Sequence, residues 1–476
     1  MHRRRCLSAL CACALSMRCP AALSAAGRSD FDWDVVVVGS GLAGHCSALA
    51  ARMAGAERVL MLEKAAITGG HSALASGSIA FVDPRRQAAQ GIEDSVEKFL
   101  ADALEVGGAI DESMVRFMAE ESAAGIDWLQ GLGVRFSPKI FSAHGGAHPR
   151  CLTAFGNMGA RRYIFELHRR CLEYGVRTRL LTKLEALSRP KPGQKGLLLE
   201  VLDERTGERS ELRAASVVLA TGGFGANLAL RMRFRPELNH EIPTTANPHG
   251  LLRDTATGDG LFLARSLGAV WTDMSCVVLL SYWGGRMLDY MGAEIYVDEQ
   301  GRRFVDETAA TSRIAKAIAG LPSRSMFVIT DAKSVKGVNV GAKIAAGSVH
   351  RSETIAEMAR AMKVPIGVLE QTVEQYNKNA RSGEPDAFGR TVFLQTIEAP
   401  PFYWGRERLM VHATLGGLRT DKNSRVLDAE GNPIEGLFAA GEVAGGIWGS
   451  DRLGGTGLLQ CLVQGRRAGS QAARMI

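Results

Sequence analysis

Long apolar segments are missing from most of this chain. After residue 30 of 476, no uninterrupted apolar run reaches the roughly 20 residues that a membrane-spanning helix needs. Haem-attachment motifs of the C-x-x-C-H type, C-x-x-C metal knuckles, internal repeats and long basic runs are missing too. These absences argue against an integral membrane protein, a c-type cytochrome and a nucleic-acid-binding protein. We therefore expect a soluble globular protein without a metal site.

The first 26 residues have a composition of their own. Three arginines, Arg3 to Arg5, precede an apolar stretch over 6–17 and small residues over 21–26. This order is typical of a secretory signal peptide. Because Arg3-Arg4 are followed by one further residue and then by apolar Cys6 and Leu7, the segment also resembles a twin-arginine export signal, although the usual Ser or Thr before the arginines is missing. The sequence predicts export to the periplasm. A mitochondrial transit peptide is the alternative, since the segment contains Arg and Ser and no acidic residue.

Removal of this segment changes the apparent charge and the cysteine content. The net charge falls from +7 to +3, because the segment contains four arginines and no acids. The cysteines fall from nine to five. An odd, widely spaced set of this kind fits buried free thiols better than a disulfide framework. These five cysteines are Cys46, Cys151, Cys171, Cys276 and Cys461.

A β-branched run over 34–38 begins a predicted βαβ unit, with a helix over 42–54 and a second strand over 58–63. Between the run and the helix, Gly39, Gly41 and Gly44 occupy the glycine positions of G-x-G-x-x-G. The first glycine permits a tight turn, the second admits a pyrophosphate, and the third lets helix and strand pack closely. Glu63 ends the second strand, where a carboxylate can accept both ribose hydroxyls. The unit predicts dinucleotide binding.

Glycine-rich segments elsewhere indicate FAD rather than NAD. Lys64 follows the acid, and a second glycine-rich stretch over 68–77, which includes Gly70, lets a longer cofactor continue past the sheet. A buried strand over 216–220 ends in glycines and returns the chain to the same sheet. Near the C-terminus, Glu442 lies in a glycine-flanked turn where a carboxylate can bind ribityl hydroxyls. We predict an FAD cofactor.

The remaining pattern predicts an α/β fold with a Rossmann-like FAD-binding domain and an inserted α+β capping domain. Residues 27–274 and 411–476 are predicted to form the FAD-binding domain, and 275–410 the insertion. The helices and strands that we expect outside the βαβ unit are helices over 92–106, 112–132 and 159–173, and strands over 196–202, 210–213 and 216–219.

These motifs occur in a specific order. They include the two glycine segments, 220–225, 257–260, 301–307, 412–417 and 440–455. In this order the sequence resembles the fumarate reductase and succinate dehydrogenase flavoprotein superfamily, most of all its soluble branch of flavocytochrome c fumarate reductases and urocanate reductases. The resemblance covers nearly the whole chain after the signal segment and implies a glutathione-reductase-like fold. It also implies FAD contacts from Ala43, Glu63, His71, Ser72, Gly77, Asp259, Glu442, Gly457 and Leu458.

His71 matches the position at which membrane-complex members of the superfamily attach FAD covalently, whereas soluble members have asparagine there. We expect non-covalent FAD, with covalent attachment as the alternative. On the substrate side, His412 and Arg452 match the positions that bind the substrate carboxylate. A guanidinium binds a carboxylate bidentately and a nearby imidazole adds a second charge-assisted hydrogen bond. Polarisation of an adjacent C=C bond would then favour hydride transfer from flavin N5.

Several positions depart from the fumarate reductases of the superfamily. The stretch over 275–282 has no histidine, and 288–292 lacks the Glu-x-x-Arg substrate clamp. The proton-donating arginine is shifted by two positions to Arg313. These departures argue against fumarate itself. Tyr282 and Asp289 are candidates for reading a larger substrate, as urocanate reductases use a tyrosine and an aspartate in this region, with ordinary packing as the alternative.

His144 and His148 lie in a glycine-rich loop, and we favour a structural role for both. The leading functional hypothesis is a periplasmic reductase of the activated C=C bond of a small unsaturated carboxylate, supplied with electrons by a separate carrier such as a cytochrome. The first alternative is a flavin-dependent dehydrogenase of a ketosteroid-like substrate, which the apolar stretch over 277–280 favours. The second is a flavin-carrying subunit that only transfers electrons.

Overall fold

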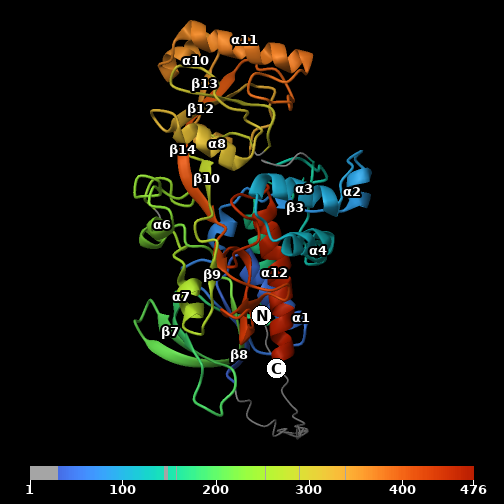
Figure 1. Ribbon diagram of the computed structural model, residues 1–476, viewed down its shortest axis with the longest axis vertical. Coiled ribbons are helices and arrows are strands. Elements are labelled where there is room, and N and C mark those ends of the chain that lie inside the picture. The colour runs from blue at the N-terminus through green and yellow to red at the C-terminus, as the bar shows by residue number, and fades with distance from the viewer. Residues whose placement is uncertain (1–30, 144–147, 157, 252, 289, 338) are drawn as a thin grey trace, which may run out of the picture.

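The computed structural model describes residues 31–143, 148–156, 158–251, 253–288, 290–337 and 339–476. The predictions for residues 1–26, His144 and Asp289 lie outside these residues. In Figure 1 the chain forms an elongated molecule, with a large sheet in its lower part and a smaller sheet covered by helices at its top. The two sheets contain residues far apart in sequence, so the chain passes from the lower part to the upper part and returns.

The large sheet has eight strands and is built around β1 (Trp33–Val38), whose six residues are all buried. β1 pairs in parallel with β2 (Val59–Leu62) on one side and with β8 (Arg209–Leu219) on the other. The strand order is β16-β17-β8-β1-β2-β5, in which β16, β17 and β5 span Arg425–Leu427, Pro433–Ala439 and Arg177–Arg179. A parallel strand buried on both faces reads as a continuous apolar run, which explains why 34–38 predicted it.

One prediction within this sheet is wrong. The segments 210–213 and 216–219 are parts of a single strand, β8. Its first half pairs antiparallel with β7 (Leu197–Asp203), and its second half pairs in parallel with β1 and β17. The first half is largely exposed and the second is buried, so one continuous strand gives two different sequence patterns. β6 (Thr182–Ser188) completes this part of the sheet by pairing with β7.

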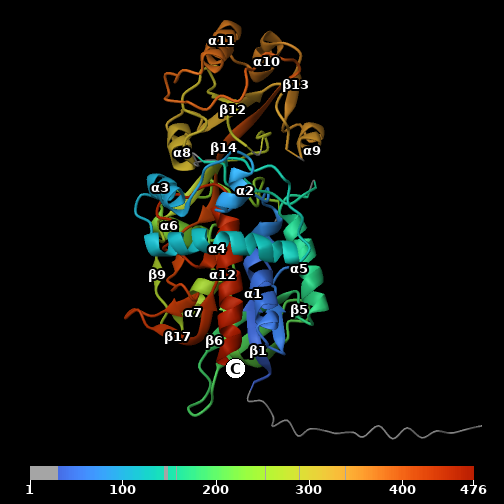
Figure 2. The same cartoon turned by 90° about the vertical axis from the view of Figure 1, so that its right-hand side faces the viewer.

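Two long helices lie side by side against the large sheet, α1 (Leu42–Met53) and α12 (Thr456–Ala472), as both views show (Figures 1 and 2). Glycines on α12 permit the close contact. A Cβ atom at Gly465 would lie 2.7 Å from the carbonyl oxygen of Ala43, and one at Gly469 would lie 2.0 Å from that of Ser47. The last helix of the chain therefore covers the helix that follows the glycine loop.

Between β2 and β5 the described part of the chain forms four α-helices. They are α2 (Pro84–Ala88), α3 (Val96–Gly107), α4 (Glu112–Gly131) and α5 (Arg161–Glu173). The predicted start of the first long one, at residue 92, is four residues too early. The side chain of Ser95 accepts a hydrogen bond from the backbone N–H of Lys98, so α3 begins after this N-cap. The predictions over 112–132 and 159–173 agree with α4 and α5 within about two residues.

The smaller sheet has the strand order β10-β14-β12-β11, with β13 also paired to β14. It lies within residues 275–414, and the limits proposed for the capping domain stay a prediction. β14 has 13 residues and runs from the top of the molecule toward the large sheet (Figure 1). Its end therefore carries His412 to the boundary between the two sheets. The elements of this part are β10 (Val277–Ser281), β11 (Ile295–Val297), α8 (Thr311–Ala319), β12 (Ser325–Thr330), α9 (Val340–Ala345), β13 (His350–Ser352), α10 (Ile355–Met362), α11 (Ile366–Ser382) and β14 (Phe402–Thr414).

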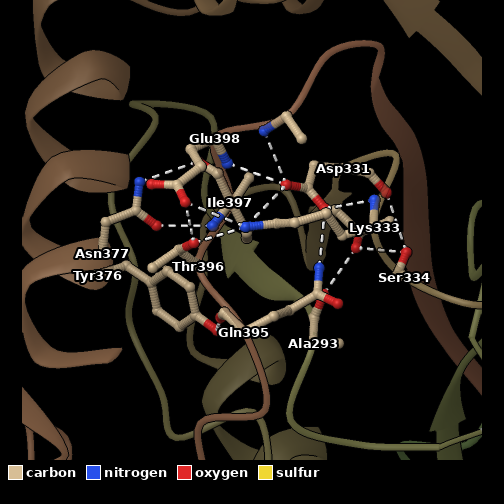
Figure 3. Close-up of polar contacts among 12 residues, drawn as sticks. Ala293, Asp331, Lys333, Ser334, Tyr376, Asn377, Gln395, Thr396, Ile397 and Glu398 are labelled. Carbon is tan, nitrogen blue, oxygen red and sulfur yellow. Dashed lines mark hydrogen bonds and ion pairs between the residues drawn. The ribbon is translucent and has the colours of Figure 1, made fainter. Parts of the chain in front are cut away.

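A buried carboxylate ties the end of β12 to the segment that leads into β14 (Figure 3). Asp331 is fully buried. It accepts hydrogen bonds from the backbone N–H groups of Lys333, Glu398 and Ala399 at 2.9–3.0 Å and from the side-chain amide of Gln395 at 2.8 Å. One side chain thus satisfies four donors, which fixes the segment before β14.

We expect Asp331→Ala to destabilise the protein by about 3 kcal/mol, because four partly buried donors lose the acceptor that Asp331 provides, and an unsatisfied buried donor costs about 1–3 kcal/mol. The measurement is the midpoint of thermal unfolding, which should fall clearly. Glu398→Ala is the matched control. The side chain of Glu398 is half exposed, accepts a hydrogen bond from Thr396 Oγ1 at 2.7 Å and forms surface ion pairs, which contribute about 0–1 kcal/mol. Equal midpoints for the two variants would contradict the structural role of Asp331.

The structure also bears on the expectations for membrane-spanning helices and for the cysteines. Within the described residues, no helix has both the length and the apolar composition for crossing a bilayer. Cys46, Cys151 and Cys171 are buried free thiols, and Cys276 and Cys461 are free and partly buried.

Candidate active site

A cleft with an empty volume of about 830 Å³ follows the carboxyl ends of β1, β2 and β8. The first residues beyond these strands, Gly39, Glu63 and Ala220, all line it. Open parallel sheets bind their ligands at this edge, because the loops that leave the strands diverge there. The lining residues from the end of the chain are Ala440, Glu442 and Cys461.

The glycine loop at the start of α1 has the geometry that its motif predicts. Gly39 has φ +104°, and a Cβ atom there would lie 2.3 Å from the carbonyl oxygen of Ala220. At Gly44 a Cβ atom would lie 1.9 Å from the carbonyl oxygen of Gly39. Gly41 is open, with only Ser72 Oγ and the Gly69 carbonyl oxygen within 4 Å of a Cβ atom. The first and third glycines thus serve packing, and the second leaves room beside the helix N-terminus.

Glu63 braces this loop from the end of β2. Its Oε2 accepts hydrogen bonds from the backbone N–H of Ser40 at 3.0 Å and from Ser40 Oγ at 2.6 Å. Its Oε1 accepts one from the backbone N–H of Ala65 at 2.8 Å. The carboxylate therefore fixes the residue between the first two glycines while it lines the cleft.

Lys64 and Asp259 form an ion pair at the edge of the cleft, with 2.8 Å between Nζ and Oδ2. Thr257 Oγ1 contacts both, at 2.6 Å from Lys64 Nζ and 2.8 Å from Asp259 Oδ1. Burial raises the pKa of Asp259, but the hydrogen bond and charge of Lys64 outweigh it and hold the pKa below its usual value. The carboxylate is therefore ionised at neutral pH.

The polar groups of the cleft fit a dinucleotide. Gly41, which precedes α1, provides no side-chain cap, and the first backbone N–H of the helix, that of Leu42, donates to Ser72 Oγ at 3.1 Å, so the N-terminus of α1 with its positive dipole end faces the cleft beside Ser72. Thr221 Oγ1 is buried and has no hydrogen-bond partner among the described residues, although Thr221 lines the cleft. Glu442 Oε1 accepts from the backbone N–H of Thr414 at 2.9 Å and from Thr414 Oγ1 at 3.1 Å. Donors for phosphate and acceptors for hydroxyls are thus both present.

Most residues predicted to bind the cofactor line this cleft, and four do not. Gly44 serves helix packing, and a Cβ atom at Gly77 would lie 2.8 Å from the backbone nitrogen of Ala160. Gly457 lies under Arg452, and Leu458 lies beside it on α12. Lining residues that the sequence did not indicate include Thr182, Lys183 and Thr255, since no motif or spacing marks them. The predicted residues that line the cleft are Gly39, Gly41, Ala43, Glu63, Lys64, Gly70, His71, Ser72, Asp259 and Glu442.

Arg452 is a recessed cation that forms no ion pair with any of the described residues. Its side chain is half-buried, and a Cβ atom at Gly457 would lie 2.8 Å from its Nη2. Burial lowers the pKa of Arg452, although the charges of Asp451 and Glu442 raise it. Among the described residues, its guanidinium forms no ion pair, and its hydrogen bond to the carbonyl oxygen of Leu453 is long, at 3.4 Å. A guanidinium in this state is suited to bind an anion.

His412 lies near the end of β14 and is half-buried. Its Nδ1 lies 3.1 Å from Thr245 Oγ1. Burial lowers the pKa of His412 to about 3, and the positive charges of Arg452, His71 and Arg286 add to this effect. The imidazole is therefore neutral at neutral pH. A hydrogen bond from this imidazole to a carboxylate would be assisted by the charges of the substrate and of Arg452.

His71, which lines the cleft, has the opposite electrostatic environment. His71 Nε2 lies 2.6 Å from Asp254 Oδ1. Burial lowers the pKa of His71, but the hydrogen bond to Asp254 and the charges of Glu442 and Asp254 raise it above its usual value. The sequence pattern did not indicate Asp254, which precedes the 257–260 motif by three residues.

Three other residues that the sequence analysis singled out, Arg313, Tyr282 and His148, do not line the cleft. Arg313 is exposed in the first turn of α8, where its backbone N–H donates to the carbonyl oxygen of Ala310 at 3.0 Å; within the described part of the chain its side chain forms no hydrogen bond or ion pair. The backbone N–H of its neighbour Ser312 donates to Asp451 at 2.7 Å, next to Arg452. Tyr282 is half-buried, and Lys343 Nζ lies 5.7 Å from the centre of its ring. His148 pairs with Asp102 at 3.0 Å, as expected for a structural histidine.

The fold and the cleft define an α/β flavoprotein with an additional sheet above its cofactor cleft. The chain belongs to the FAD-binding domain family, whose family model matches residues 34–458. FAD is its cofactor, and the predicted fold class is confirmed. The protein is an FAD-dependent oxidoreductase.

Two curated relatives match nearly the whole chain. One is a probable fumarate reductase, Ifc3, of Shewanella frigidimarina, 33% identical over 94% of this chain and 76% of the relative. The other is a urocanate reductase of Eggerthella lenta, 33% identical over 93% of this chain and 75% of the relative. The resemblance that the motifs indicated is thereby confirmed.

Two solved structures have the same fold. The open conformation of a flavocytochrome c3 fumarate reductase has a TM-score of 0.71 and 31% identity, over 93% of this chain and 78% of that chain. A 3-ketosteroid-Δ4-(5α)-dehydrogenase from Rhodococcus jostii RHA1 has a TM-score of 0.68 and 27% identity, over 94% of this chain and 99% of that chain.

Proposed function

We propose that this enzyme reduces the activated C=C bond of a small unsaturated carboxylate. The observation that carries the proposal is the half-buried guanidinium of Arg452, which has no acidic partner among the described residues and interacts electrostatically with His412 and Glu442. A carboxylate of the substrate would pair with this guanidinium and neutralise its charge. Relatives named as fumarate and urocanate reductases, both over most of the chain, support the reaction class.

Arg452 and His412 have separate tasks in this proposal. The guanidinium neutralises the carboxylate and withdraws electron density from the adjacent C=C bond. The neutral imidazole, with Nδ1 accepting from Thr245, offers an N–H at Nε2 as a second donor. Bound FAD supplies the hydride. The residues of the chain therefore contribute position and electrostatic stabilisation.

For the proton we propose Arg313, with Tyr282 as a residue that contacts the substrate. Arg313 is exposed, but Ser312 beside it is hydrogen-bonded to Asp451, which precedes Arg452. A shift within the first turn of α8 would bring the guanidinium toward the substrate. Arg313→Gln should then lower kcat without changing the FAD content, whereas an equal kcat would remove Arg313 from the mechanism.

We further propose that the protein is exported to the periplasm, that a separate carrier such as a cytochrome supplies electrons, and that FAD is bound non-covalently. The arginine-rich N-terminal segment supports export. The pairing of His71 with Asp254 supports the last point, since it engages one ring nitrogen. Acid precipitation should release all the yellow colour into the supernatant.

The decisive experiment is an anaerobic assay with reduced viologen as electron donor. Acrylate, cinnamate, urocanate and fumarate serve as acceptors, and we expect at least one to be reduced. A parallel assay supplies a saturated 3-ketosteroid to the oxidised enzyme with a dye as electron acceptor. Steroid-dependent reduction of the dye, without reduction of any unsaturated acid in the first assay, would replace the proposal by the dehydrogenase alternative. Inactivity in both assays, with copurification of a cytochrome, would favour an electron-transfer subunit.

A further inference from the structure

The ion pair of His71 and Asp254 has a defined orientation relative to the cleft. His71 lies in the short 3-10 helix Gly70–Ala73 and lines the cleft, with 27% of its side chain exposed. Asp254 does not line the cleft, and only 5% of its side chain is exposed. The carboxylate thus lies behind the imidazole, and the positive end of the pair faces the cofactor cleft.

The surroundings of Asp254 fix it in place. Thr244 Oγ1 donates to Oδ2, and the backbone N–H of Ala256 donates to Oδ1 at 3.0 Å. Arg231, which is buried, donates to backbone carbonyl oxygens of residues 225, 238, 239 and 242 and so holds the segment that leads to Thr244. Both carboxylate oxygens are therefore engaged before any cofactor is considered.

Thr244 also links the pair to the substrate side. Residues 244 and 411 form a parallel bridge, in which the backbone N–H of Thr245 donates to the carbonyl oxygen of Val411 at 2.9 Å. The side chain of Thr245 contacts His412, and that of Thr244 contacts Asp254. One dipeptide thus positions groups at both ends of the site.

The charged groups that face the pair come from four elements. Asp254 and Glu442 face His71 with negative charge, and His412 faces it as a neutral ring. Arg231 faces Asp254 from α6 (Leu228–Phe234). Burial raises the pKa of Asp254, yet the hydrogen bond and charge of His71 outweigh this and lower the pKa to about 2. The pKa of His71 is raised and that of Asp254 is lowered, so the 2.6 Å contact favours the ionised form of both partners.

We propose that Asp254 holds His71 as a permanent imidazolium at the flavin end of the cleft, and that this fixed positive charge makes bound FAD easier to reduce. Glu63 marks the adenosine end by its position in the motif, and His71 interacts with Glu442 and His412 at the other end. Reduced flavin carries more negative charge than oxidised flavin, so a preorganised cation nearby stabilises it. The pair acts as positioning residues, and the proposal needs only the FAD cofactor.

The test measures the reduction potential of bound FAD by dye equilibration between pH 5 and 9, without any substrate. In Asp254→Asn the imidazole loses the hydrogen bond and the charge of Asp254, which raise its pKa, while burial still lowers the pKa and Glu442 still raises it, so we expect the pKa to fall to the acidic side of neutral pH. We expect a new inflection, in that acidic range, in the plot of the reduction potential against pH. At pH values below the inflection, the potential of the variant should equal or exceed that of the wild type. Above the inflection the imidazole is neutral, and the potential should be more negative than that of the wild type.

Two further variants make the result specific. The double variant His71→Asn with Asp254→Asn should give a more negative potential at neutral pH and no inflection, because no titrating imidazole remains. His350→Asn, an exposed histidine stacked on Trp404 in the upper sheet, should behave as the wild type. FAD content and thermal midpoint confirm that each variant is folded.

If Asp254→Asn does not fold, Thr244→Val removes one of the hydrogen bonds that hold Asp254 and should shift the potential in the same direction by less. A potential of Asp254→Asn that parallels the wild type over the whole pH range would overturn the proposal. So would an inflection that persists in the double variant. Flavin that stays on acid-precipitated protein, and is lost from the double variant, would also overturn it, since His71 would then be alkylated. None of these outcomes depends on which acid the enzyme reduces.

Discussion

Arg452→Met should lower kcat/KM for the unsaturated acid about 100- to 1,000-fold while FAD stays bound. Truncation of one partner of a buried, hydrogen-bonded charge pair costs about 2–5 kcal/mol of interaction free energy. Each change of about 1.4 kcal/mol corresponds to a tenfold change in kcat/KM. Methionine keeps the apolar volume of the side chain beside Gly457 and removes only the charge and the donors. The measurement is steady-state reduction of the acid by reduced viologen.

Two controls separate binding of the carboxylate from structural effects. Arg452→Lys keeps the charge but not the bidentate donor geometry and should be intermediate. Arg205→Met removes a guanidinium that pairs with Asp203 on an exposed hairpin, and it should leave kcat/KM unchanged. If Arg452→Met kept the activity of the wild type, the guanidinium would not bind the substrate and the proposed function would lose its main support.

Gly44→Ala should abolish stable FAD binding and lower the thermal midpoint strongly. The added Cβ atom would lie 1.9 Å from the carbonyl oxygen of Gly39 and 2.9 Å from its carbonyl carbon. Because both atoms belong to the backbone of the phosphate loop, no side-chain rotation relieves the overlap. Either α1 moves away from β1 or the turn at Gly39 opens, and both changes disrupt the cleft. Absorbance of the purified protein at flavin wavelengths measures the FAD content.

The matched control is another glycine to alanine change within a helix. Gly131 is the last residue of α4, and a Cβ atom there meets no atom within 4 Å. Gly131→Ala should be neutral or stabilise the protein by up to about 1 kcal/mol, since alanine has the higher helix propensity. FAD content equal to that of the wild type in Gly44→Ala would show that the third glycine is not needed for close packing.

The cofactor half of the site was largely predictable because its residues are local in sequence. The turn at Gly39, the packing at Gly44 and the carboxylate of Glu63 all belong to one βαβ unit of about 30 residues. In such a unit the spacing of residues determines their spacing in the fold. The same reasoning failed for β8, because the pairing partner changes halfway along one strand and the exposure changes with it.

The substrate half was predictable only in part. The motifs around His412 and Arg452 indicated both residues, but not their charge states. The neutral state of His412 results from burial and from Arg452, His71 and Arg286, which lie far away in sequence. The contact of His71 with Asp254 likewise joins residues 183 positions apart along the chain, and Thr244, which supports Asp254, is a further 10 positions away from that aspartate.

The sequence by itself determined the cofactor, the fold class and the family, because these depend on short motifs in which glycine conformations and one carboxylate suffice. Only the tertiary structure decided which of the two histidines is charged. A pKa depends on burial and on charges within a few ångströms, and those neighbours come from four separate segments. In the structure, Arg452 forms no ion pair with any of the described residues. Its guanidinium is therefore suited to bind an anionic substrate.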